Sequence, residues 1–172
     1  MPTPPLLLDD FRAERSAIDT TWQLFTDRVM GGRSDAQAKR SRIAGTHCLV
    51  VEGLVRTEGN GGFLQVALPL APADGVLDAS AYTGVRVTVA RGSGTWALHL
   101  RTPACTAPWM HYRAELPGRA VRQWVPVDVP FTAFSAEGVG TALDVRTLQR
   151  LGIVAVKPAG PAQLAISRVE LV

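Results

Sequence analysis

Glycine and proline interrupt this chain about every eight to twelve residues, and this spacing is what most limits the folds open to it. The segments between are short and rich in valine, leucine and threonine, so they favour strands joined by turns over long helices. We therefore expect an all-β fold, a jelly-roll-like β-sandwich with at most one or two short helices. A chain of 172 residues suits one such domain.

Several segments alternate apolar and polar residues, as strands with one buried face do. In residues 85–89 the valines share one face, and in residues 96–101 Trp96, Leu98 and Leu100 do the same. The predicted strands are residues 21–25, 34–40, 47–52, 62–68, 85–91, 95–101, 109–116, 122–129, 151–156 and 162–172.

Little helix is expected. Residues 144–150 are predicted to form one or two turns with Asp144 as N-cap, and a short turn is expected after Pro130. Residues 1–12 are expected to form a loosely held arm anchored by Phe11, and residues 13–172 the sandwich domain. Because no basic leader or long apolar run is present, we expect a cytoplasmic location and no membrane insertion.

Charge and cysteine content predict neither a polyanion-binding face nor a metal site. The net charge is +3, and no block of five or six like charges occurs. Cys48 and Cys105 stand alone without histidine at ligand spacing, whereas a zinc site needs about four ligands. We expect no metal and no cofactor, and we expect Cys48 to be buried.

Three segments resemble the family of complex I intermediate-associated protein 30, CIA30. Residues 27–34 read DRVMGGRS after Trp22 and match the family's D-x-V-M-G-G-x-S signature closely. Residues 59–63, GNGGF, resemble its G-G-F turn and strand, and residues 124–134 its W…P-F-x-x-F segment. One departure is Thr26, where the family usually carries asparagine.

The resemblance implies a galactose-binding-like sandwich, similar to several carbohydrate-binding modules. It implies that the mitochondrial members are assembly factors for respiratory complex I, and that some plant relatives serve photosystem II production with RNA involved. Since the chain starts without an import extension, it looks like a bacterial, single-domain member.

The first candidate binding segment is the pair of glycine-rich loops. Adjacent glycines can expose backbone N–H groups as an anion-binding nest, to which Asp27 and Ser34 would add ligands. The alternative is a tight connection in which Val29 and Met30 plug the end of the sandwich, and a plain hairpin at Asn60-Gly61. The candidate loop residues are Asp27, Met30, Gly31, Gly32, Ser34 and Asn60.

The second candidate is a polar sheet face, because alternation places cations and imidazoles on the wet side of the central strands. Gln65 is an expected neighbour, and Trp109 is the expected exposed aromatic residue. The alternative is an ordinary solvated face with Arg–Glu pairs that use Glu52 and Glu115. The candidate face residues are Arg86, His99, Arg101, Trp109, His111 and Arg113.

The leading hypothesis is a non-catalytic, protein-binding assembly factor whose partners would be respiratory-complex subunits or assembly intermediates. The first alternative is a carbohydrate-binding or other small-ligand domain on the same face, and the second is an RNA-binding accessory protein, although an RNA partner is not expected. No G-x-S-x-G, HExxH or Cys–His motif supports catalysis, so we do not expect an enzyme. We expect Arg101→Ala and Trp109→Ala to weaken binding and leave the melting temperature nearly unchanged.

Overall fold

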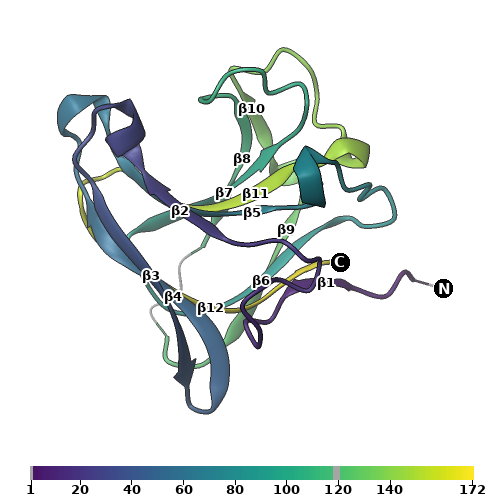
Figure 1. The fold of residues 1–172 in the computed structure, drawn as a ribbon, viewed down its shortest axis with the longest axis horizontal. Coiled ribbons are helices and arrows are strands. Elements are labelled where there is room, and N and C mark those ends of the chain that lie inside the picture. The colour runs from purple at the N-terminus through teal and green to yellow at the C-terminus, as the bar shows by residue number, and fades with distance from the viewer. Residues whose placement is uncertain (1, 118–120) are drawn as a thin grey trace.

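Two antiparallel sheets packed face to face make up the part of the chain that the computed structural model describes, residues 2–117 and 121–172 (Figure 1). The first sheet contains, in spatial order, β3 (Asp35–Ile43), β4 (Thr46–Val55), β12 (Gly160–Leu171), β6 (Gly84–Ser93) and β9 (Val125–Pro130), with β1 (Leu6–Asp9) also paired to β12. The second contains β10 (Ser135–Glu137), β8 (His111–Leu116), β7 (Thr95–Arg101), β11 (Arg150–Val156), β5 (Phe63–Pro69) and β2 (Gln23–Thr26). The predicted all-β sandwich is thus confirmed.

Five short 3-10 turns lie in the described connections. They are η1 (Asp27–Met30), η2 (Glu58–Asn60), η3 (Pro72–Asp74), η4 (Phe131–Ala133) and η5 (Val145–Thr147). The last confirms the short turn predicted at residues 144–150, since the Asp144 carboxylate caps it by accepting from the Arg146 N–H at 3.0 Å. No helix among the described residues is long and apolar enough to span a bilayer.

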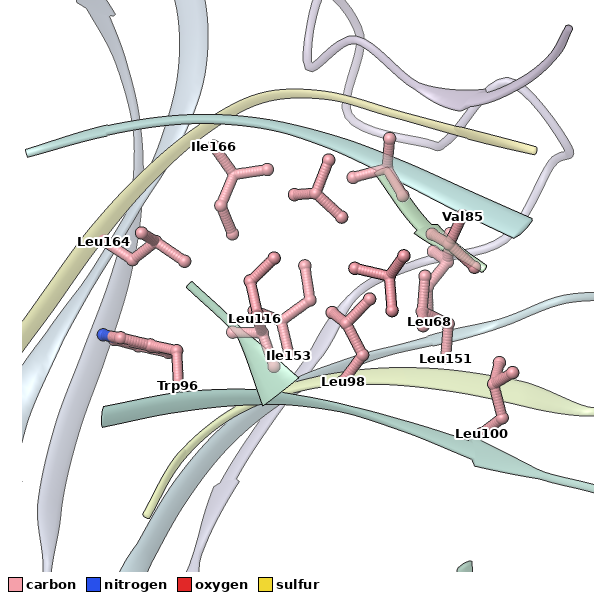
Figure 2. Packing of buried hydrophobic residues seen from close by; sticks show 14 of the residues in the cluster. Leu68, Val85, Trp96, Leu98, Leu100, Leu116, Leu151, Ile153, Leu164 and Ile166 are labelled. Carbon is pink, nitrogen blue, oxygen red and sulfur yellow. The ribbon is translucent and has the colours of Figure 1, made fainter. Parts of the chain in front are cut away.

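The core lies between the sheets and is built by the alternation read from the sequence. Trp96, Leu98 and Leu100 extend from β7 into the space between the sheets, and Leu164 and Ile166 enter it from β12 on the other side (Figure 2). The valines of β6 at positions 85, 87 and 89 are fully buried on the same inner side. Inward and outward residues alternate because successive side chains of a strand point to opposite faces, so the remaining set is left for the two outer faces.

Three segments of the structure differ from the sequence prediction. The segment expected as a loose arm contains β1, which pairs with β12, and both Leu8 and the expected anchor Phe11 are buried. The three-residue β10 was not predicted, because a strand that short has no readable alternation. The hairpin expected at Asn60-Gly61 is wrong: β4 and β5 belong to different sheets, and η2 crosses between them.

Candidate functional site

The outer face of the second sheet is concave. In Figure 1, β8 and β10 rise at one side of β7, β11 and β5, and the turns η1 and η2 rise at the other. Ala97 and Val154 face outward here and are nonetheless fully buried, so larger side chains around them cover this part of the sheet. We call the polar side chains of this concavity the histidine–arginine face. It comprises His99, Arg101, His111, Arg113 and Arg150.

Strand register explains why these five side chains gather. Arg113 of β8 is the partner of His99 of β7, whose partner on β11 is Gly152. Arg101 is the partner of Arg150 in the next outward-facing row. The sequence prediction therefore grouped His99, Arg101, His111 and Arg113 correctly in space.

The two histidines stack on one another. Their ring centroids are 3.8 Å apart and the rings are inclined by 12°. His111 Nδ1 lies 2.9 Å from the Trp109 carbonyl oxygen, which can only accept, so this nitrogen carries the proton. His99 Nε2 is buried and has no hydrogen-bond partner among the described residues. Such an atom costs free energy unless a ligand or water satisfies it.

Both histidines are held neutral by their surroundings. Burial, followed by the charges of His111, Arg113 and Arg150, lowers the pKa of His99 to about 3. Burial also lowers the pKa of His111, although the Trp109 carbonyl and Glu137 act in the opposite direction. At neutral pH the stack is therefore uncharged, and one of its ring nitrogens, His99 Nε2, is buried without a partner among the described residues.

Arg101 organises the loop beside the face. Its Nη1 lies 3.1, 3.0 and 2.6 Å from the carbonyl oxygens of Ala107, Pro108 and Met110, and its Nη2 lies 3.1 Å from that of Cys105. These contacts fix residues 105–110, including Trp109. Arg101, predicted as a binding residue, is thus committed to the scaffold, although its charge is not neutralised by these carbonyls.

Trp109 is the exposed aromatic residue that the sequence predicted, with 64% of its surface accessible. Its indole lies against Gly138, at whose position a Cβ atom would come within 3.6 Å of Trp109 Cδ1. The ring therefore has a fixed support at the rim of the concavity, next to His111.

Arg150 was not predicted as a site residue, because the segment 144–150 was interpreted as a short helix. It opens β11, and its guanidinium lies over the Phe25 ring, 5.4 Å from the centroid. It makes no hydrogen bond or ion pair with any described residue. Burial, and next the charge of Arg101, lowers its pKa. The missed signal was the outward alternation of Arg150 with Gly152 and Val154.

A pocket of about 240 Å³ lies where Arg101 and Arg150 meet the loop after β5. A larger groove, about 500 Å³, lies on the outer face of the first sheet, but the Gln37 and Glu52 side chains in it already bond to each other at 2.6 Å. We therefore place the candidate site in the concavity of the second sheet, where polar atoms remain without partners.

Arg86 does not belong to this face, contrary to the sequence prediction. It lies on β6 in the first sheet, where Asp128 holds it through contacts of 2.6 and 3.0 Å. Alternation within a strand shows which residues share a face of that strand, but not which sheet the strand joins, and this is why the grouping failed.

The DRVMGGRS segment and the GNGG segment form one cluster, which we call the Asp27 knot: Asp27, Gly32, Ser34, Gly61 and Gly62. The Asp27 carboxylate is fully buried and accepts from Ser34 N at 2.9 Å, Ser34 Oγ at 2.6 Å and Gly62 N at 2.5 Å. Phe63 N adds a contact of 3.3 Å. Burial opposes the charge of Asp27, but these hydrogen bonds outweigh it and lower its pKa.

The glycines of the knot are required by close packing. A Cβ atom on Gly32 or Gly61 would overlap the Asp27 carboxylate, and Gly31 adopts a left-handed φ of 85°. Asp27 and Ser34, predicted as loop binding residues, thus hold together the two crossings between the sheets. The Asn60 side chain, predicted alongside them, lies outside the described part of the structure.

Val29 and Met30 project from the knot into solvent. They are 72% and 56% exposed, so the alternative in which they plug the end of the sandwich is wrong. The knot presents two apolar side chains on a rigid base, since its inner polar atoms are satisfied.

Metal binding finds no support within residues 2–117 and 121–172. No group of three or more histidine, cysteine, aspartate or glutamate side chains is placed to hold an ion there. Cys48 and Cys105 are buried free thiols, and burial raises the pKa of Cys48.

Solved structures with the same fold include carbohydrate-binding modules. A family 11 module of a cellulosomal cellulase of Clostridium thermocellum superposes with a TM-score of 0.76 at 13% identity, over 99% of this chain and 95% of that one. The same family's module in complex with a β-1,3-1,4-mixed-linked tetrasaccharide gives 0.72 at 12% identity, over 98% and 95%. A family 30 module from Clostridium thermocellum gives 0.56 at 13% identity, over 100% and 94%.

Sequence comparison identifies the family. None of the curated protein sequences matches the chain. The family model described as Complex I intermediate-associated protein 30 (CIA30) matches residues 10–166, nearly the whole chain. The chain therefore belongs to the CIA30 family.

Proposed function

We propose that this chain is a non-catalytic binding module that holds a glycan in the concavity of its second sheet. The observation that carries the proposal is the histidine–arginine face, where His99 Nε2 and the Arg150 guanidinium lack partners among the described residues. Sugar hydroxyls accept hydrogen bonds, so a glycan can satisfy the Arg150 guanidinium, which lines the pocket at the end of this face. His99 Nε2 has no solvent-accessible surface, so a glycan reaches it only where the side chains that cover it move. Trp109 at the rim offers an aromatic surface against which a sugar ring can pack.

The fold neighbours support the same ligand class. The family 11 module, whose fold this chain shares, was solved with a mixed-linked tetrasaccharide. At 12% identity this likeness concerns the fold alone. The chemistry of the ligand must therefore be argued from this chain's own side chains.

The histidines favour binding over catalysis. A general base works best with a pKa near the operating pH, and the pKa of His99 is about 3, so it is a poor proton acceptor at neutral pH. His111 already donates its Nδ1 proton to a backbone carbonyl. The stack thus suits an uncharged contact surface.

The test is a fluorescence titration of Trp109 with a panel of oligosaccharides that includes the mixed-linked tetrasaccharide. We expect a saturable shift with at least one glycan. Calorimetry with that glycan, which does not depend on the Trp109 signal, should then show weaker binding for Trp109→Ala and for Arg113→Ala. Arg86→Ala is the matched control, since Arg86 lies on the other sheet. A flat response across the panel, or equal losses for Arg113→Ala and Arg86→Ala, would contradict the proposal.

A second candidate function is docking of a protein partner, as the family description suggests for an assembly factor. The observation that favours it is the exposed pair Val29 and Met30 on the rigid Asp27 knot. Exposed apolar side chains on an ordered base are typical of docking anchors. Affinity purification from the native host tests it: respiratory-complex subunits should be recovered with the wild type and lost with the Val29→Ser/Met30→Ser double variant.

A further inference from the structure

The pocket at the end of the histidine–arginine face is lined by two arginines, Arg101 and Arg150. The glycan proposal does not depend on their positive charge. Its volume is about 240 Å³, below the range of about 300–1,000 Å³ for drug-sized ligands, so it suits one sugar ring or a smaller group. The side chains that argue for its chemistry are Gln23, Asp74, Arg101, Gln149 and Arg150.

Two guanidinium groups meet in this pocket, and neither forms an ion pair with a carboxylate in the described part of the chain. Arg101 contacts only backbone carbonyls, and Arg150 contacts the face of Phe25. The charge that bears on the pKa of Arg150 is that of Arg101. Because a guanidinium stays protonated, the two positive charges persist at neutral pH.

Asp74 determines how much negative charge a ligand of this pocket can carry. It lines the same pocket, is exposed, and makes no ion pair with Arg101 or Arg150. Two guanidiniums and one carboxylate leave one formal positive charge. One negative charge on a ligand balances this, whereas a dianion such as a phosphate ester would leave the pocket with a net negative charge.

We infer that this pocket binds the carboxylate of a uronic acid residue, so that the ligand of the concave face is an acidic glycan. The inference rests on the proposed function. The planar, monovalent carboxylate matches the fork of donors on Arg150. Gln23, Gln149 and Asp74 offer hydrogen-bond partners for the ring hydroxyls beside it.

The experiment compares two probes by calorimetry in low salt: trigalacturonic acid and the same trisaccharide with its carboxylates methyl-esterified. The ester has nearly the same shape but no charge. We expect the acid to bind about tenfold more tightly or better, and Arg150→Gln to remove the difference. Arg146→Gln is the matched control, because Arg146 is exposed on η5 and pairs with Asp144 outside the pocket. A thermal melt of each variant checks that it is folded.

The outcomes separate the inference from the proposed function. Equal affinities for acid and ester would overturn the inference and leave glycan binding in place, as would binding of the neutral mixed-linked tetrasaccharide alone. Tighter binding of a sulfated than of a carboxylated trisaccharide would overturn the choice of carboxylate. Failure of every glycan would overturn both, and so would exclusive binding of an octaglutamate peptide, which would assign the pocket to an acidic protein segment.

Discussion

The Asp27 knot and the histidine–arginine face are both polar clusters, but the polar atoms of the knot have hydrogen-bond partners and several of those on the face do not. In the knot, Asp27 accepts hydrogen bonds from Ser34, Gly62 and Phe63, and its carboxylate is fully buried. On the face, His99 Nε2 has no partner among the described residues, and Arg150 has an aromatic ring beneath it but no carboxylate beside it.

This difference separates what the signature motif does from what the surface can do. A buried carboxylate that accepts several hydrogen bonds stabilises the loops around it and has little left for a ligand. A face with unmatched polar groups is less stable than it could be, and such groups are where a ligand gains affinity. The motif that identifies the family thus builds the end of the sandwich, and the proposed ligand site lies elsewhere.

The largest effect should come from breaking the knot. Asp27→Ala removes the acceptor and leaves several buried donors without a partner, so we expect the free energy of unfolding to fall by about 3–5 kcal/mol. Urea unfolding followed by tryptophan fluorescence measures it. Asp35→Ala is the control, because Asp35 is exposed and bonds only Arg28, and it should cost less than about 1 kcal/mol. A similar loss for both variants would refute the structural role of Asp27.

The next largest effect should come from Gly32→Ala. The added Cβ would overlap the Asp27 carboxylate, so the knot must open or shift, at a cost of about 2–3 kcal/mol in unfolding free energy. Gly140→Ala provides the comparison, since nothing lies within 4 Å of its Cβ position. If both alanine variants melt at the wild-type temperature, the knot is looser than the contacts imply.

The fold could be predicted largely from the sequence because its information is local. Alternation marked β6 and β7 and their inward residues, and glycine and proline marked their ends. What failed was non-local: the Asn60-Gly61 connection reads as a hairpin, yet β4 and β5 lie in different sheets. A strand's own sequence does not say which strand it pairs with.

The site followed the same rule. His99, Arg101, His111 and Arg113 were grouped correctly because β7 and β8 are consecutive and paired. Arg150 was missed because residues 144–150 were interpreted as a short helix, and Arg86 was wrongly included because β6 belongs to the first sheet. The exposure of Trp109 could be predicted from its place after Pro108 and its alignment with the polar residues of the strand. The burial of Asp27 could not be predicted, because the groups that donate hydrogen bonds to it come from residue 34 and residues 62–63.

The buried histidine of the histidine–arginine face should make the free energy of unfolding depend on pH. The pKa of His99 in the folded state, about 3, lies below the value of 6.5 usual in the unfolded chain. The unfolded chain therefore binds a proton first, and stability falls as pH drops below about 6.5. We expect a loss of about 2 kcal/mol between about pH 6 and pH 4.5, and a flatter profile for His99→Gln.

The window assigns the effect to the two stacked histidines, because burial also lowers the pKa of His111, which therefore loses stability over the same pH range. The difference between the wild type and His99→Gln gives the share of His99. Asp27, whose pKa is lowered, loses its contribution only as pH falls below its usual value of 3.8, so it does not act above about pH 4.5. His47→Gln makes the same substitution on β4, in the other sheet, and should leave the acid limb unchanged. A wild-type profile that is flat above about pH 4.5 would show that His99 is solvated in the folded protein.

The smallest effects on stability should come from Arg101→Ala and Trp109→Ala, and the two variants should differ. Arg101→Ala removes four contacts to carbonyls of residues 105–110 and should cost about 1–3 kcal/mol, contrary to the expectation drawn from sequence that its melting temperature would stay unchanged. Trp109→Ala removes an exposed side chain and should cost less than about 0.5 kcal/mol. Paired thermal melts and glycan titrations decide between them: Trp109→Ala should lose binding while keeping its melting temperature, whereas Arg101→Ala should lose both. Equal melting temperatures for the two variants would mean that the loop of residues 105–110 is held without Arg101, and would leave Arg101 free to contact the ligand directly.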